Sequence, residues 1–258
     1  MTQTAKVNYH VHSDARQAYH IDVDGVAGAI MSPKHVVTDV TVLDTRGAAD
    51  VSFLDDSVAF YIEPTAIKEF ASREDWQPVY DCELTELLRR EIGAQEVIVF
   101  DHTVRVDDPN SERKPARNVH SDYSSEGAKN RLVDILGETR AAEWARGHYA
   151  FINVWRPVDA PINSAPLGFV RPSSVPDDDW ILIDLIYPER KGHIMGLVAN
   201  PSHEWLYRSR MTPDEVAVFN IYDSAGAPSI AHSALDMAED PSATVPRKSI
   251  ESRTLIRY

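Results

Sequence analysis

The second half of the chain constrains the fold most, because most of its segments are typical of β-strands. These segments are YAFINVWRPV, DWILIDLIYP, HIMGLVAN, EVAVFNIYDS and SIESRTLIRY. β-Branched and aromatic residues dominate them, and prolines and short polar loops separate them. Six to eight strands, with the helices gathered earlier in the chain, predict a mainly β protein: a jelly-roll or barrel with helical decoration.

The first half of the chain predicts further strands and the helices. VVTDVTVLDTRG, DDSVAFYIEP and EVIVFDHTVRVDD (96–108) favour strands. PVYDCELTELLRREIGA has leucines at helical spacing and predicts a helix that ends near Gly93. SSEGAKNRLVDILGETRAAEWARG predicts two short helices that are broken at Gly137.

The composition excludes several kinds of partner and site. The formal net charge is −14, and because phosphate binding favours a basic face, neither nucleic acid nor an anionic membrane is an expected partner. No apolar run has transmembrane length and no signal-peptide pattern opens the chain, so we expect a cytoplasmic protein. The single cysteine, Cys82, excludes an internal disulfide and cysteine-rich zinc sites. The ten histidines are therefore the main source of metal chemistry.

Histidine and aspartate two residues apart occur three times, as His12/Asp14, His20/Asp22 and His120/Asp122. Side chains two apart on a strand point to the same face, so such a pair at a strand end can bind one ion. A second histidine from another strand completes the two-histidine, one-carboxylate site of non-haem Fe(II) enzymes. The third pair follows an expected core strand. The first two precede any such strand, and we expect them to be exposed polar residues.

The C-terminal segment IAHSALDMAEDPSATVPRKSIESRTLIRY is more specific than any His-x-Asp pair. His232 precedes Arg247 by fifteen residues, and Ser249 follows two residues later, at the start of the last strand. An Fe(II) oxygenase that uses 2-oxoglutarate needs a distal histidine and, after it, an arginine that pairs with the far carboxylate of this acid. We therefore expect His120, Asp122 and His232 to bind the metal, and Arg247 with Ser249 to bind the cosubstrate.

Two other histidines compete for a role near the metal. His203, in SHEWLYRSRM, follows a strand, but no Arg-x-Ser lies at a useful distance after it. We expect His203 to line a pocket or to serve the structure. His102 lies on the strand before the His120 motif, where packing or a hydrogen bond near the site is favoured over ligation.

Several blocks in the same order resemble a family of non-haem iron enzymes. The blocks are VIVFDHTVR, RNVHSDYS, INVWRPV…APL, HEWLYRSRMTPDEVAVFNIYDS and PRKSIESRTLIRY, and they span roughly residues 96–258. The family includes the fungal hydroxylase/desaturases of aspergillic-acid type, the gibberellin desaturases and proteins related to the cephalosporin methoxylases. The resemblance implies a double-stranded β-helix, a jelly-roll of cupin-like type, that binds Fe(II) and 2-oxoglutarate. It also implies hydroxylation or desaturation of a small molecule, with release of succinate and CO2.

The resemblance also carries over residue by residue. It makes His120, Asp122 and His232 the metal ligands and Arg247 the partner of 2-oxoglutarate. The INVWRP block adds Asn153 as a hydrogen-bond donor to the cosubstrate, with Trp155 on the same face. The expected substrate-pocket residues are Tyr123, Trp155, His203 and Arg253, and Arg253 is also the alternative anion partner. The family usually has Glu where this chain has Lys248, at a position that should face away from Arg247.

We also expect a single domain, residues 1–258. Within it, residues 1–94 form N-terminal strands and a helix that support the core, and residues 95–258 form the catalytic double-stranded β-helix.

Two alternatives of another class remain open. One is a β-barrel of the same fold that binds a ligand without redox chemistry, although a pure binder does not need the Arg-x-Ser tail. The other is a cupin-type metal enzyme without a cosubstrate, which would commonly have His-x-His near a glutamate; here His10-x-His12 is misplaced. The substrate, the choice between hydroxylation and desaturation, the oligomeric state, and the choice between Arg247 and Arg253 also stay open.

Overall fold

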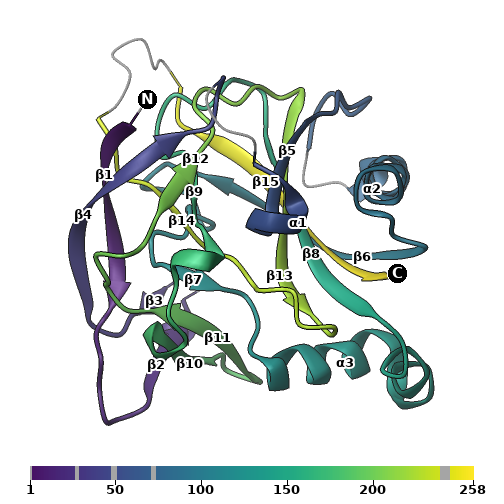
Figure 1. The fold of residues 1–258 in the computed structure, drawn as a ribbon, viewed down its shortest axis with the longest axis horizontal. Helices are drawn as coiled ribbons and strands as arrows, with labels where there is room; N and C mark the ends of the chain where they lie inside the picture. Colours follow the sequence, from purple (N-terminus) through teal and green to yellow (C-terminus); the bar gives the residue numbers. More distant parts are fainter. Residues whose placement is uncertain (1, 27–28, 48–50, 71–73, 239–244) are drawn as a thin grey trace.

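The strands form two sheets that face each other, as Figure 1 shows for the computed structural model, which describes residues 2–26, 29–47, 51–70, 74–238 and 245–258. The large sheet has ten strands in the order β1-β4-β12-β9-β14-β7-β11-β10-β2-β3. The small sheet has five, in the order β5-β13-β8-β15-β6. This pair of sheets makes the mainly β core that the sequence predicts.

The bounds of the elements are as follows. The large sheet contains β1 (Thr2–His10), β2 (Gln17–Ile21), β3 (Ile30–Met31), β4 (His35–Asp44), β7 (His120–Ser121), β9 (Leu167–Val170), β10 (Trp180–Ile186), β11 (Lys191–Leu197), β12 (Trp205–Tyr207) and β14 (Ala231–Ala234). The small sheet contains β5 (Val58–Ile62), β6 (Glu96–Val106), β8 (Tyr149–Pro157), β13 (Glu215–Asp223) and β15 (Lys248–Arg257). The α-helices are α1 (Phe53–Asp56), α2 (Gln77–Ile92) and α3 (Ser125–Trp144), and short 3-10 turns occupy Val23–Gly25, Glu74–Trp76, Pro172–Ser174 and Asp177–Asp179.

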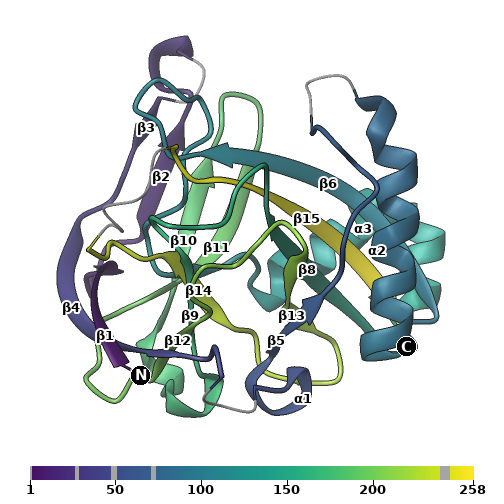
Figure 2. The same ribbon diagram turned by 90° about the horizontal axis from the view of Figure 1, so that it is seen from above.

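The small sheet is covered on both faces. All nine residues of β8 are buried, which explains why this strand is almost continuously apolar instead of alternating. Helix α2 packs on the outer face with Tyr80, Leu84 and Leu88, which lie on one side of the helix. Figure 2 shows α2 running along this side of the small sheet.

The inner face of the small sheet packs against the large sheet. Phe219 of β13 meets Phe169 of β9 edge to face, with ring centroids 5.1 Å apart. Helix α3 adds Leu132 and Trp144 to the same core. The two sheets are thus held together by aromatic packing, and the site described below lies at one end of this core.

The large sheet curls so that its first strand reaches the strands near its middle. Beyond its ladder with β4, β1 forms isolated bridges from Lys6 to Asp236, from Asn8 to Asn118 and from His10 to Val198. The curl encloses a second core on the other side of the sheet. Its members include Ala5, Val7, Tyr9, Val42, Val119, Val170, Leu197, Trp205 and Ala231.

A bulge in β6 changes which of its side chains face inward. The pairing with β15 shifts between Arg253 and Thr254, which leaves Phe100 as an additional residue in β6. Before the bulge, the even-numbered Ile98 packs into the core between the sheets. After it, the even-numbered Val104 packs on the side of α2. The odd-numbered side chains of the second half of β6 therefore face the inside.

The predicted elements are confirmed where they show clear periodicity. The expected strands after residue 148 are all present, α2 ends before Gly93 in a left-handed conformation, and α3 is broken at Gly137. The structure adds the short strands β7, β9, β12 and β14. The expectation that no core strand precedes His12 is wrong, because β1 pairs within the large sheet. Among the described residues, no helix has both the length and the apolar character needed to span a membrane.

The break in α3 gives a testable prediction about stability. Gly137 has φ 74° and ψ 161°, a combination that only glycine adopts readily. No atom would contact an added Cβ, so Gly137→Ala introduces backbone strain alone, and we expect the free energy of unfolding to fall by about 1–3 kcal/mol. Gly147→Ala is the matched control, because its Cβ would make only ordinary contacts at an unstrained φ. Urea unfolding of both variants measures the difference, and equal stabilities would refute the assigned conformation.

Candidate metal centre

Two histidines face each other on adjacent strands of the large sheet. His120 opens β7 and His232 lies in β14, and the two residues are direct partners in the antiparallel pairing. Directly opposed residues place their side chains on the same face of a sheet. Their ring centroids lie 4.5 Å apart, so strand register brings together two side chains that are far apart in the sequence.

Asp122 completes a cluster of three possible ligands. Its Oδ1 atom lies 3.5 Å from Nε2 of His120 and 3.8 Å from Nε2 of His232. One donor atom from each of the three residues lies within 4.8 Å of the others. All three side chains are buried or nearly so, and the three predicted metal-binding residues thus come together in the structure.

Backbone carbonyl groups orient both imidazole rings. Nδ1 of His120 lies 2.8 Å from the carbonyl oxygen of Asn118, and Nδ1 of His232 lies 3.4 Å from that of Ile230. In a neutral imidazole, a proton on Nδ1 that is donated to this carbonyl group leaves a free lone pair on Nε2. Burial, and then the neighbouring His120, lowers the pKa of His232 to about 4. The ring is therefore neutral near pH 7, the form that binds metal.

The two oxygens of the Asp122 carboxylate have different partners. Its Oδ2 atom accepts hydrogen bonds from Nδ2 of Asn153 at 3.0 Å and from Nε of Arg253 at 2.9 Å, whereas Oδ1 faces the two histidines. Burial raises the pKa of Asp122, but the Arg253 guanidinium and the two histidines together hold it well below its usual value. The group is therefore a fixed carboxylate with one oxygen directed at the cluster.

These donors fit a divalent transition metal. Two imidazole nitrogens and one carboxylate oxygen on one side of an ion are the donor set of non-haem Fe(II) sites, which leave further positions open. The partners at Nδ1 of each histidine and at Oδ2 of the aspartate are of the kind that orient metal ligands. The chemistry of the three side chains and their free donor atoms therefore accommodates Fe(II).

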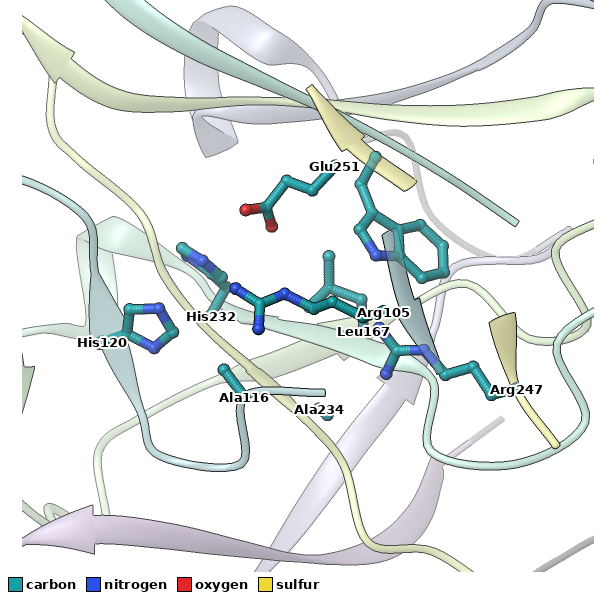
Figure 3. A pocket seen from close by; sticks show the side chains of 9 residues that line it. Arg105, Ala116, His120, Leu167, His232, Ala234, Arg247 and Glu251 are labelled. Atoms are coloured by element: carbon teal, nitrogen blue, oxygen red, sulfur yellow. The ribbon is translucent and has the colours of Figure 1, made fainter. Parts of the chain in front are cut away.

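A small pocket adjoins the cluster. Nine residues line it: Arg105, Ala116, His120, Trp155, Leu167, His232, Ala234, Arg247 and Glu251. Figure 3 shows the two histidines on one side of this space and Arg247 on the other. The pocket thus joins the metal cluster to a buried guanidinium, as the order of motifs in the tail predicts.

Arg247 is fixed at the far end of this pocket. Its guanidinium lies over the Trp155 ring, 5.1 Å from the centroid, and donates to Oγ of Ser249 at 3.3 Å and to the carbonyl oxygen of Ala165. Its Nε has no partner among the described residues. Arg247, Ser249 and Trp155 are thus grouped as the sequence predicts.

Arg253 contacts three carboxylates. It donates to Asp122, to Oδ2 of Asp101 at 2.6 Å and to Glu251. Although burial lowers it, the charges of these carboxylates raise the pKa of Arg253 well above its usual value. Three carboxylates thus surround this guanidinium, and its contact with Oδ2 holds Asp122 in place.

Asn153 also has a different partner from the expected one. It lies on the same inward face of β8 as Trp155, whereas Arg156 points to the opposite face and donates to the carbonyl oxygens of Glu63 and Pro213. The amide nitrogen of Asn153 donates to Asp122 and not into the pocket. Asn153 thus lies on the inward face of β8, as the sequence predicts, but its hydrogen bond goes to the Asp122 carboxylate.

The remaining pocket candidates lie outside the described lining. The Tyr123 ring packs on Phe151, with centroids 4.9 Å apart. Nδ1 of His203 lies 2.8 Å from Oη of Tyr9, and its Nε2 lies 3.1 Å from Oδ2 of Asp179. These contacts place His203 beside the second core.

The N-terminal histidines do not form a comparable cluster in the described residues. His12 and Asp14 are exposed. His10 is buried and stacks near His35, with centroids 4.9 Å apart. His102 lies on the outer side of β6, where it contacts Ser252 and Asp81; it therefore packs and hydrogen-bonds, as expected, but away from the metal cluster.

Sequence reasoning missed two lining residues, Arg105 and Glu251. Glu251 lies on the inward face of β15 between the predicted Ser249 and Arg253, so strict alternation along this strand would have identified it. Arg105 faces inward only because of the bulge at Phe100. Residues 97–100 are all apolar, so the sequence carries no clear signal of this bulge.

Comparison with known proteins identifies relatives over most of the chain. Residues 7–257 match the family described as oxidoreductase/YMDC permease-like domain. The hydroxylase/desaturase efuI of Hormonema carpetanum is 31% identical over 222 residues, which cover 74% of this chain and 74% of that protein. The hydroxylase/desaturase CTB9 of Cercospora beticola is 29% identical over 97% of this chain and 86% of its own length. The alpha-ketoglutarate-dependent dioxygenase phiK, from a fungal species (strain ATCC 74256), is 27% identical over 85% of this chain and 83% of its own length.

The fold matches a solved enzyme structure along its whole length. The iron and alpha-ketoglutarate-dependent endoperoxidase NvfI superposes with a TM-score of 0.87, covering 99% of this chain and 98% of that one at 23% identity. This agreement confirms the predicted fold class, and the sequence relatives confirm the resemblance to the hydroxylase/desaturases. The chain therefore belongs to the oxidoreductase/YMDC permease-like domain family, together with the fungal hydroxylase/desaturases.

Proposed function

We propose that the protein is an Fe(II)- and 2-oxoglutarate-dependent oxygenase that hydroxylates or desaturates a small molecule. In this proposal His120, Asp122 and His232 hold the iron. The observation that carries it is the convergence of two imidazole nitrogens and one carboxylate oxygen at the end of a pocket that leads to a buried arginine. The names of the relatives phiK and NvfI, which are alpha-ketoglutarate-dependent, support the same conclusion.

The residues around the ligands keep the three donor atoms available. The carbonyl oxygens of Asn118 and Ile230 hold the protons of the two imidazoles on Nδ1. Asn153 and Arg253 hold Oδ2 of Asp122, so that the carboxylate offers Oδ1 alone. Such an arrangement favours one-sided binding of the ion, because the protein ligands occupy one face and leave the other open.

The other end of the pocket suits the far carboxylate of 2-oxoglutarate. Arg247 remains charged and presents planar donors that match a carboxylate, and Ser249 adds a hydroxyl beside it. The Trp155 ring supports the guanidinium from one side. Leu167, with Ala116 and Ala234, keeps this part of the pocket apolar, and an apolar wall strengthens the charge pairing.

Iron bound with 2-oxoglutarate and dioxygen supplies the oxidation of a C–H bond, with succinate and CO2 as coproducts. The chain itself supplies ligand geometry, the orientation of the acid and the exclusion of water. We place the substrate on the side of Tyr123, next to Asp122. That the substrate is a small molecule, that no nucleic acid is bound and that the enzyme works in the cytoplasm are further parts of the proposal.

We also propose that residues 1–258 act as one domain in which residues 1–94 support the catalytic part, 95–258. In support, strands from the first segment enter both sheets: β1 and β4 join the large sheet and β5 joins the small one. Neither sheet is therefore complete without the N-terminal segment.

The metal assignment predicts a spectroscopic difference between two histidine variants. Anaerobic addition of Fe(II) and 2-oxoglutarate to the wild-type chain should give the weak visible charge-transfer band of the chelated acid. His120→Ala should abolish the band because one of three ligands is lost. His12→Ala should retain it, since His12 is exposed. Loss of the band in His12→Ala with retention in His120→Ala would move the site to the N-terminus, and its absence from folded wild-type protein would refute the cosubstrate.

The assignment of Arg247 predicts a separation between the two ligands. Arg247→Ala should raise the dissociation constant of 2-oxoglutarate by about 10- to 100-fold, because a charge-assisted pair of hydrogen bonds is lost. The affinity for Fe(II) should change little. Lys248→Ala is the control, because this neighbouring side chain pairs with Asp159 at the surface. Calorimetric titrations measure both affinities, and equal losses for iron and 2-oxoglutarate would indicate a role in folding instead.

A further inference from the structure

The pocket contains two guanidinium groups that lack a carboxylate partner. Among the described residues, neither Arg105 nor Arg247 has a carboxylate oxygen within 4.0 Å, whereas Arg253 has three such partners. The one acidic group of the lining, Glu251, is paired with Arg253. The lining therefore carries two positive charges that no described side chain neutralises directly.

The bulge at Phe100 brings Arg105 into this position. Because the alternation of β6 is shifted, Arg105 faces inward, paired in register with Ser249 of β15. Its Nη1 donates to the carbonyl oxygen of Lys114 at 2.9 Å, which fixes one side of the guanidinium. Figure 3 shows the group extending toward His120 and His232, on the side of the pocket away from Arg247.

Two neighbouring guanidinium groups without a carboxylate, Arg247 buried and Arg105 half-buried, repel each other unless an anion joins them. Arginine does not lose its proton under ordinary conditions, so burial cannot be relieved by neutralisation. Burial first, and then the charge of the neighbouring Arg105, lower the pKa of Arg247 to about 9. A molecule with one carboxylate would neutralise one guanidinium, whereas a dicarboxylate with its ends at opposite sides of the pocket would neutralise both.

We propose that Arg105 is the second anchor of the cosubstrate: it binds the carboxylate next to the keto group, at the metal end, while Arg247 binds the far carboxylate. This inference rests on the proposed function and adds that each of the two arginines binds a different carboxylate of the cosubstrate. Arg105 recognises the 2-oxo acid head, which all 2-oxo acids share. Arg247 recognises the tail, which only a dicarboxylate has.

If each arginine binds a different carboxylate, the two arginine variants should differ in which of two acids they bind more weakly. We use the full chain loaded with Mn(II), which does not turn over, and follow ligand chelation by the relaxation of water protons at the metal. The two ligands are 2-oxoglutarate and 2-oxobutyrate, which lacks the far carboxylate. Arg105→Gln should weaken both ligands by the same factor, about 10- to 100-fold. Arg247→Gln should weaken 2-oxoglutarate alone and leave 2-oxobutyrate unchanged.

The controls separate this inference from folding and from the proposed function. Arg113→Gln is the matched control, because Arg113 is exposed on the loop after β6; it should bind both acids as wild type does. Mn(II) affinity reports an intact metal cluster in every variant. If Arg105→Gln no longer binds Mn(II), Arg105→Lys is tested in its place. This variant should lose less affinity than Arg105→Gln, and again by the same factor for both acids.

Three outcomes would overturn the assignment. If Arg105→Gln weakens 2-oxoglutarate but not 2-oxobutyrate, Arg105 serves the tail and not the head. If neither acid is weakened, Arg105 is not part of the cosubstrate site. If the Mn(II)-loaded wild type binds neither acid, the proposed function itself fails, a result distinct from a failure confined to the Arg105 variants.

Discussion

The ion pair between Arg253 and Asp122 is the interaction on which the rest of the site depends. Asp122 follows β7 of the large sheet and Arg253 belongs to β15 of the small sheet, so the pair links the two sheets directly at the metal cluster. Burying either charge alone would cost several kcal/mol, by order of magnitude. The same guanidinium also contacts Asp101 and Glu251. The three carboxylates are therefore held as one unit, and the orientation of the ligand oxygen follows from that unit.

A local irregularity supplies the groups that make this unit possible. With regular alternation, a strand that buries Ile98 and Phe100 in the core would turn Asp101 and Arg105 away from it. The bulge reverses the alternation within β6, so the first half of the strand packs the core and the second half lines the site. Bulges next to active sites commonly re-aim side chains in this way. Strand β6 therefore contributes side chains both to the core and to the site, which a strand of regular alternation would not do with this sequence.

The parts of the site that could be predicted from the sequence rest on short-range spacing. His120 and Asp122 stand two apart, and His232, Arg247 and Ser249 follow in a fixed order in one segment. The break at Gly137 and the end of α2 at Gly93 were equally visible, because each depends on a single residue with a left-handed φ. These features are local, and local rules describe them well.

The parts that could not be predicted depend on pairing between distant segments. Strands β7, β9, β12 and β14 have two to four residues, which is too short for periodicity to reveal them. The face of Asn153 followed from alternation, but its partner did not, because Asp122 reaches it from the other sheet. The position of β1 was missed for the same reason: its ladder with β4 and its bridges to later strands are long-range pairings.

The N-terminal segment fixes the position of a ligand that lies more than a hundred residues later. Val119, immediately before His120, donates its N–H to the carbonyl oxygen of Asn8 at 3.0 Å, which ties β7 to β1. His10, at the end of β1, packs on Gly196, the strand partner of His120; a Cβ there would lie 2.6 Å from Cδ2 of His10. Glycine at this position is thus what allows β1 to approach. His120 itself pairs with β11 and β14, and the two residues before it are tied to β1, so the position of this ligand also depends on the first ten residues.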